Sequence, residues 1–172
     1  MKRGLIVIAN ENYDCSHLNP FLINLPGPTQ GERGYRVLVS FSHHTFTRSF
    51  DDNVDPLDFL YVEQGDRRCF CQDRYLASKT LPRLIETQSN GKAYFAQNDN
   101  FMLLEQGVGA APYAVFFSIQ RARNSGGADV VMFVKSAYEK PNLIAKSRLS
   151  SISFKTLVHK KVRGEKITKP KK

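Results

Sequence analysis

Residues 35–42 read Tyr-Arg-Val-Leu-Val-Ser-Phe-Ser, and this stretch decides the fold class. Tyr35, Val37, Val39 and Phe41 stand at every second position, so in an extended chain their side chains lie on one face. This period of two predicts a β-strand that turns an apolar face towards a core. The chain is therefore expected to build on a β-sheet.

The remaining apolar pattern predicts more strands than helices. The run 130–134, Val-Val-Met-Phe-Val, is unbroken, which is typical of a central strand covered on both faces. Leu81, Leu84 and Ile85 share one face of a helix predicted over 81–87, and 72–79 predict another turn or short helix. Further strands are predicted over 59–62, 67–71, 93–97, 101–105, 113–120 and 152–162, the first two forming a hairpin. We expect an α+β fold with a mostly antiparallel sheet of about six strands and one or two short helices.

The length of 172 residues favours one domain. We expect a single α+β domain over residues 1–165, in which 10–34 form an irregular segment rich in turn formers. A basic flexible tail should follow over 166–172. The apolar runs are too short for a membrane helix or a signal peptide, so we expect a cytoplasmic protein that has no membrane partner.

The charge of the chain is concentrated in its last third. Residues 113–172 hold 14 Lys/Arg against three Asp/Glu, whereas residues 1–112 hold 11 Lys/Arg against 13 Asp/Glu. The whole formal charge of +9 therefore comes from the C-terminal third. A surplus of this kind attracts polyanions, and we expect a nucleic-acid partner, RNA before DNA.

The densest polar and aromatic cluster is 40–48, Ser-Phe-Ser-His-His-Thr-Phe-Thr-Arg. If the register of the preceding strand continues, His43 and Thr45 fall on the core side with Thr47. Ser42, His44, Phe46 and Arg48 would then lie on the opposite side. An imidazole beside a guanidinium and a hydroxyl can exchange protons and hold phosphate, so His44 and Arg48 are candidate catalytic residues. The alternative is that both histidines are hydrogen-bonded residues at the end of a strand.

A second cluster, 66–75, contains three arginines and a tyrosine. Arg68, Arg74 and Tyr75 are candidates for phosphate contact and proton transfer. Asp66 and Asp73 stand beside arginines in the same stretch, so ordinary surface ion pairs are the alternative.

The third cluster lies in the strand predicted over 152–162. Lys155, His159 and Arg163 would share one face there and form a cationic ridge. The alternative is that lysines protect an edge strand from aggregation.

Several kinds of site lack support in the sequence. No phosphate-binding glycine loop, dinucleotide fingerprint, nucleophile elbow or zinc-protease motif is present. Cys69 and Cys71 are two positions apart, which predicts two small buried residues on one face of a strand. A zinc site made by these cysteines with His43 and His44 would usually need a Cys-x-x-Cys or similar spacing. We expect no metal and no cofactor.

The stretches Phe41 to Arg48, Arg68 to Tyr75, Val130 to Tyr138 and Ser153 to His159 resemble a family of small, largely uncharacterised bacterial and prophage proteins with no assigned activity. The resemblance runs from about Tyr35 to Gly164. The layout is also similar in outline to barnase-like and RelE-like ribonuclease toxins. That second likeness concerns the fold alone and carries over no catalytic residue.

Together these patterns predict a nucleic-acid-acting protein. The first hypothesis is a small metal-independent endoribonuclease of toxin or phage-defence type, because RNA supplies its own nucleophile, the 2′-hydroxyl. His44 would transfer protons with Tyr75 or His159 as its counterpart. Charge on the phosphate would be stabilised by Arg48, Arg68 and Arg74, and the RNA backbone would be bound by Lys155, Lys160, Lys161 and Arg163.

Two alternatives lack catalysis. One is a prophage regulator that binds nucleic acid or a protein such as an antitoxin or a host enzyme. The other is a partner-binding protein whose lysines keep it in solution. All three hypotheses depend on where the fold places the late cations relative to His44.

Overall fold

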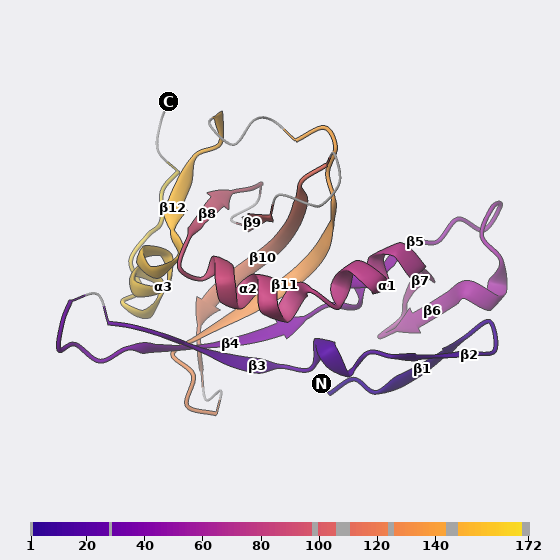
Figure 1. Cartoon of the computed structure of the whole chain (residues 1–172), viewed down its shortest axis with the longest axis horizontal. Helices are drawn as coiled ribbons and strands as arrows, with labels where there is room; N and C mark the ends of the chain where they lie inside the picture. The colour runs from indigo at the N-terminus through magenta and orange to yellow at the C-terminus, as the bar shows by residue number, and fades with distance from the viewer. Residues whose placement is uncertain are drawn as a thin grey trace.

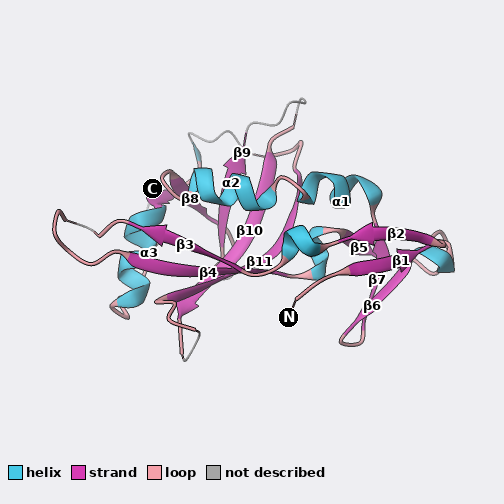
Figure 2. Cartoon of the chain, turned by 60° about the horizontal axis from the view of Figure 1, so that its bottom comes forward, coloured by secondary structure: helices cyan, strands magenta, loops and turns pink. Residues whose placement is uncertain are grey.

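The alternating stretch forms strand β4 (Tyr35–Phe41) in the computed structural model, as predicted. Val37, Val39 and Phe41 are buried, and Leu38 lies on the other side. The structure describes residues 2–27, 29–97, 100–105, 111–123, 126–143 and 148–169. Among these residues, the strands form a seven-stranded sheet, a three-stranded sheet and a two-stranded hairpin, accompanied by three α-helices (Figures 1 and 2).

The seven-stranded sheet is antiparallel except at one pair. Its order is β12 (Ser151–Ser153), β8 (Lys92–Phe95), β9 (Phe101–Glu105), β10 (Tyr113–Arg121), β11 (Val130–Glu139), β4 and β3 (Phe21–Leu25). β11 and β4 are parallel, with Val130 opposite Val37 and Val134 opposite Phe41. The expected α+β class and mostly antiparallel sheet are confirmed.

The smaller sheets extend the molecule beyond the end of β4. The three-stranded sheet contains β5 (Thr47–Ser49), β7 (Asp66–Phe70) and β6 (Leu60–Glu63), in that order. The predicted hairpin is its β6–β7 pair, and Gln64 and Gly65 both have positive φ, as a type I′ turn requires. The two-stranded hairpin is β1 (Leu5–Ile8) with β2 (Glu11–Asp14).

The core lies on one face of the large sheet. Helix α2 (Leu81–Gln88) buries Leu81, Leu84 and Ile85, and α1 (Gln72–Ser78) precedes it. Both helices form where the sequence predicted them. β11 is central, as expected, but the prediction that it is covered on both faces is wrong, because Phe133 is 40% exposed. The face away from the helices carries a smaller apolar cluster around Met102, Leu104 and Ala114.

The prediction of a strand over residues 152–162 is wrong for most of this range. Only β12 is extended, and residues 154–162 form helix α3 (Phe154–Val162). Phe154, Leu157 and Val158 are buried with helical spacing, and the Ser153 hydroxyl caps the helix by accepting from the Thr156 amide at 3.1 Å. Gly164, at φ 71°, follows the end of the helix.

Two predicted irregular segments contain more structure than expected. Residues 10–34 hold β2, the short 3₁₀ turn η1 (Ser16–Leu18) and β3, so the expected irregular segment is partly regular. In the predicted flexible tail, residues 166–169 have no regular secondary structure, but Ile167 packs against the main core. Residues 170–172 lie outside the described residues. The described part of the chain contains no candidate membrane-spanning helix.

The core predicts a large difference between two phenylalanines. Phe117 is fully buried in β10, 5.8 Å from the Phe101 ring centroid and 6.0 Å from that of Phe154. Phe117→Ala should lower the free energy of unfolding by about 3–5 kcal/mol. The matched change Phe133→Ala in the open part of β11 should cost about 1 kcal/mol or less. Urea denaturation measures both, and equal losses would contradict this placement of the core.

Candidate functional site

The two adjacent histidines lie where β4 ends. The strand ends at Phe41, and the amide of the next residue, Ser42, donates to the Val134 carbonyl at 2.8 Å. The Ser42 hydroxyl then accepts from the His44 amide at 3.2 Å, which starts the 3₁₀ turn η2 (His43–Thr45). Because the chain turns here, the strand register does not continue. His43, Thr45 and Thr47 are buried as expected, but Phe46, predicted on the opposite side, is fully buried too.

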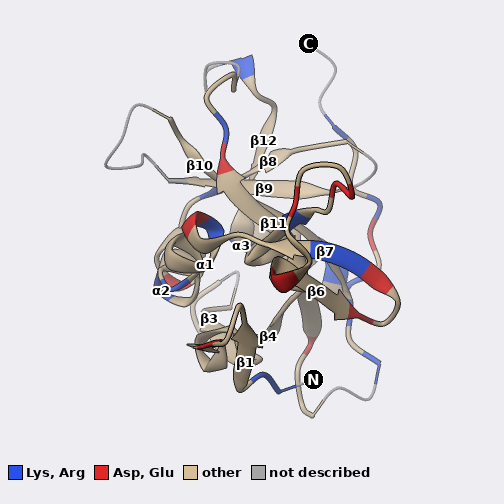
Figure 3. Ribbon diagram, turned by 90° about the vertical axis from the view of Figure 1, so that its right-hand side faces the viewer, with Lys and Arg blue, Asp and Glu red and all other residues tan. Residues whose placement is uncertain are grey.

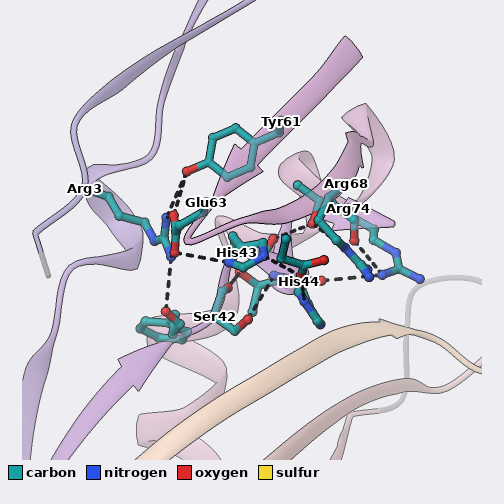
Figure 4. Close-up of polar contacts among 12 residues, drawn as sticks. Arg3, Ser42, His43, His44, Tyr61, Glu63, Arg68 and Arg74 are labelled. Carbon is teal, nitrogen blue, oxygen red and sulfur yellow. Dashed lines mark hydrogen bonds and ion pairs between the residues drawn. The ribbon is translucent and has the colours of Figure 1, made fainter. Parts of the chain in front are cut away.

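Two carboxylates, one on each side of the β6–β7 turn, contact the histidines of η2. Glu63 and Asp66 pair across the hairpin, so their side chains leave the same face of the small sheet. Glu63 receives hydrogen bonds from Arg3 (Nη1 at 2.6 Å and Nη2 at 3.0 Å) and from the Tyr61 hydroxyl at 2.7 Å (Figure 4). The Arg3 and Glu63 side chains are 7% and 13% exposed, so this ion pair is nearly removed from solvent.

The proton affinities of this group follow from its contacts. Burial tends to raise the pKa of Glu63, but hydrogen bonds from Arg3 and Tyr61 outweigh burial and lower it to about 2. Burial, with the Glu63 carboxylate, raises the pKa of Tyr61 to about 12. The pKa of Asp66 is lowered by hydrogen bonds from His44 and then from His43.

Asp66 joins the two imidazoles. Its Oδ2 lies 2.7 Å from His44 Nε2 and 3.0 Å from His43 Nε2, and His43 Nδ1 lies 3.1 Å from Glu63 Oε1 (Figure 4). The His44 side chain is 36% exposed, whereas that of His43 is 11% exposed. His44 is therefore the imidazole that a solvent-borne substrate can reach.

Two of the predicted arginines lie beside His44. Arg74 Nη1 donates to the carbonyls of Thr47 at 2.7 Å and of His44 at 3.4 Å, and its guanidinium lies 5.0 Å from the Tyr138 ring centroid. Arg68 Nε donates to the Thr47 hydroxyl at 3.4 Å, and burial lowers the pKa of Arg68. Neither guanidinium forms an ion pair within the described part of the chain, so both keep charge available for an anion.

Arg48 and Tyr75 do not join this cluster. Arg48 stands opposite Cys69 in β5–β7, one position out of step with Arg68, so it leaves the other face of the small sheet. There it pairs through both nitrogens with Asp55, whose pKa it lowers to about 2. Tyr75 is buried and donates to the Asp14 carbonyl at 3.0 Å. Both side chains are therefore committed to structural contacts.

The C-terminal cations also lie elsewhere. His159 Nδ1 contacts the Tyr35 hydroxyl at 2.8 Å, at the start of β4, whereas His44 follows the end of that strand. A strand of this length spans about 20 Å. Figures 1 and 2 place α3 and the three-stranded sheet at opposite ends of the molecule. Helix α3 carries Lys155, Lys160 and Lys161, and Arg163 follows its last residue. The cationic ridge that a strand would have formed is therefore absent, and these four side chains do not lie beside His44.

Sequence reasoning missed most of the carboxylate side of the site. Glu63 and Asp66 flank a recognisable turn, so a functional interpretation of that hairpin could have included them. Arg3 gave no local signal, because its partner lies 60 residues away. Figure 3 views this end of the molecule and shows acidic and basic positions next to one another along β7. The site is therefore a mixed-charge cluster rather than a purely cationic groove.

The cluster can do two kinds of chemistry. His44, with Asp66 on one nitrogen and two guanidiniums nearby, can transfer protons at a bound phosphate. His43, His44 and Asp66 also place one potential metal-ligand atom each within 4.8 Å of one another.

Comparison with known protein families identifies the family of this chain. The sequence model of the YjaZ family matches residues 5–162. The chain belongs to the YjaZ family. This YjaZ match includes both histidines, Glu63 and Asp66, and begins just after Arg3. Neither the curated proteins nor the solved structures gave a match, so the outline likeness to ribonuclease toxins stays a prediction.

The buried ion pair predicts an unequal effect of two arginine substitutions in this YjaZ protein. Arg3→Ala leaves the Glu63 carboxylate buried without its cation and should cost about 3–5 kcal/mol of unfolding free energy. Arg67→Ala removes an ion pair with Asp52 in which the two side chains are 50% and 69% exposed, and should cost about 1 kcal/mol or less. Urea denaturation at neutral pH measures both. An Arg3 variant as stable as the Arg67 variant would show that the buried pair contributes little.

The lowered pKa of Glu63 predicts a pH dependence. A carboxyl whose pKa falls on folding stabilises the protein above its unfolded pKa of about 4.3, and this contribution fades as the pH drops towards 2. Glu63→Gln should be less stable than wild type at pH 6, and the difference should shrink steadily down to pH 2.5. Urea denaturation across this range measures it. Parallel stability curves for the two proteins would contradict the assignment.

Proposed function

We propose that the protein acts on RNA in the cytoplasm as a small metal-independent endoribonuclease of toxin or phage-defence type, with His44 as its proton-transfer group. One observation carries the proposal. The accessible imidazole of His44 is oriented by a carboxylate and lies beside Arg68 and Arg74, which have no ion-pair partner among the described residues. An oriented imidazole beside available cations suits proton transfer at a phosphate.

Asp66 determines which nitrogen of His44 is reactive. A carboxylate accepts hydrogen bonds, so the 2.7 Å contact places a ring proton on Nε2. In the neutral ring the lone pair is then on Nδ1, which has no hydrogen-bond partner within the described ranges. Nδ1 is therefore the atom that would accept a proton from a substrate.

RNA matches these groups because it carries its own nucleophile. Nδ1 of His44 would take the proton of the 2′-hydroxyl, and the 2′-oxygen would form a bond to the adjacent phosphorus. The bond from phosphorus to the 5′-oxygen would break, and that oxygen would receive a proton from the imidazolium or from water. The products are a 2′,3′-cyclic phosphate and a 5′-hydroxyl, and Arg68 and Arg74 would stabilise the charge that develops on phosphorus.

The proposed site is smaller than the set of residues predicted from the sequence. Arg48 is occupied by Asp55, Tyr75 by the Asp14 carbonyl, and His159 lies at the far end of β4. The proposal gives none of these three a part in the chemical step.

A second candidate, a non-catalytic regulator that binds nucleic acid, is favoured by the position of α3. Lys155 is exposed there and lines a cavity of about 250 Å³ with Tyr35 and His159. Lys160 and Arg163 share Glu165, at 3.8 and 2.9 Å, which reduces the charge that they offer. Because this surface is remote from His44, a polyanion could bind to it without being cleaved.

A comparison of two histidine variants tests the proposal. His44→Gln should lower the rate of RNA cleavage in EDTA by at least about 100-fold, because glutamine cannot transfer the proton. His17→Gln is the matched control and should cleave like wild type, since His17 contacts the Ser78 hydroxyl outside the site. Cleavage is followed with end-labelled RNA, and urea denaturation checks that both variants fold.

Three outcomes would count against the ribonuclease. Wild-type protein that gives no products with any RNA, or a His44 variant that cleaves like wild type, contradicts the assignment. RNA binding that weakens with salt but yields no products would favour the regulator instead. Absence of binding even at low salt would contradict both candidates.

A further inference from the structure

Both ring nitrogens of His43 contact a carboxylate oxygen, which is one contact more than a neutral imidazole can satisfy with its single N–H. Its Nδ1 lies 3.1 Å from Glu63 Oε1, and its Nε2 lies 3.0 Å from Asp66 Oδ2. A neutral imidazole has one N–H, so it can donate to only one carboxylate. The second contact needs either an additional ring proton or another cation between the nitrogen and Asp66.

The surroundings of His43 favour Nδ1 as the nitrogen that carries the proton. Glu63 is held in place by the bidentate Arg3 and by Tyr61, so its Oε1 is a fixed acceptor for Nδ1–H. Nε2 then directs its lone pair towards Asp66 and His44. A histidine that donates one N–H to a buried carboxylate while its other nitrogen faces a metal is the usual arrangement in metalloproteins.

The remaining groups complete a set of metal ligands. His44 Nε2 lies 2.7 Å from the same Asp66 oxygen, and the three potential ligand atoms lie within 4.8 Å of one another. The Asp66 side chain is 44% exposed and that of His44 36%, so an ion can enter from solvent. Arg3 neutralises Glu63, which leaves Asp66 as the carboxylate charge offered to a cation.

We infer that His43 Nε2, His44 Nε2 and Asp66 Oδ2 form a binding site for a first-row divalent transition-metal ion, with Zn²⁺ as the representative ion. Two imidazoles and one carboxylate are ligands that such ions accept, and a solvent molecule would complete the coordination. Ligand atoms about 2.0–2.1 Å from a tetrahedral ion lie about 3.3 Å apart. The contacts to Asp66 would therefore widen by about half an ångström, which its exposed side chain permits.

This site does not depend on the proposed ribonuclease, but it would regulate such an activity. A metal ion on Nε2 of His44 leaves the proton of the neutral ring on Nδ1, so Nδ1 would lose the lone pair assigned above to the 2′-hydroxyl proton. Bound metal should therefore suppress cleavage. This consequence, unlike metal binding itself, rests on the proposed function.

Direct metal titration tests the site without RNA. The untagged 172-residue protein, stripped with EDTA and exchanged into metal-free buffer, is titrated with Zn²⁺ against a chromophoric chelator and with Co²⁺ by visible absorption. We expect one ion per chain. His44→Gln and Asp66→Asn should each weaken binding at least tenfold. Glu63→Gln should weaken it by about 10–100-fold, because His43 Nδ1 loses the carboxylate that orients the ring. His17→Gln should bind like wild type.

The inference is overturned if wild-type protein does not compete with the chelator, or if both His44→Gln and Asp66→Asn bind Zn²⁺ like wild type. It is also overturned if Co²⁺ shows a thiolate charge-transfer band that disappears in Cys71→Ser, because the ion would then be held by cysteine. Both site variants change side chains that are more than a third exposed, so they should fold. Cleavage is assayed in EDTA, so failure of the ribonuclease proposal leaves this titration unaffected.

Discussion

The buried ion pair between Arg3 and Glu63 connects parts of the chain that lie in or beside different β-sheets. Arg3 precedes the β1–β2 hairpin, and Glu63 ends β6 in the three-stranded sheet. Arg3 Nη2 also donates to the Phe41 carbonyl at 3.4 Å, at the end of β4. One guanidinium therefore fixes the chain start, the small sheet and the end of the large sheet relative to one another. Separating the two buried side chains would leave each charge unpaired away from water, which costs folding free energy. The segments that carry Arg3 and Glu63 are therefore held at the distance that keeps the pair intact.

That constraint reaches the imidazoles through a short series of contacts. Glu63 orients His43, and Asp66 on the other side of the same turn orients both histidines. Because the two carboxylates flank a two-residue turn, their spacing is set by the backbone of the hairpin. The site is thus held by rigid elements, although its histidines lie in a single short 3₁₀ turn.

Sequence reasoning predicted correctly those strands and helices whose apolar pattern fits only one type of secondary structure. The alternation at 35–41 fits only a strand, and Leu81, Leu84 and Ile85 fit only a helix face. Residues 154–162 fit both periods, since Phe154 and Val158 are consistent with alternation and Phe154, Leu157 and Val158 with a helix. The Ser153 cap and Gly164 would have favoured the helix.

The site was harder to predict, because it depends on register and on long-range contacts. Arg48 and Arg68 have the same chemistry, but their faces follow from the pairing of Ser49 with Arg68, which local sequence does not determine. Sequence reasoning singled out His44, Arg68 and Arg74, and the fold brings these three residues close together. Arg3 and the carboxylates could be recognised only after the chain had folded.

The parallel pairing of β4 with β11 has a consequence for biosynthesis. Ser42, which starts the histidine turn, is anchored by the Val134 carbonyl, 92 positions further along the chain. Contacts of such high sequence separation form slowly and raise contact order. The first half of the protein therefore leaves the ribosome before the histidine turn can be anchored. In a nascent or truncated chain that lacks β11, Ser42 has no Val134 carbonyl to bind, and the turn gains this support only when β11 pairs with β4.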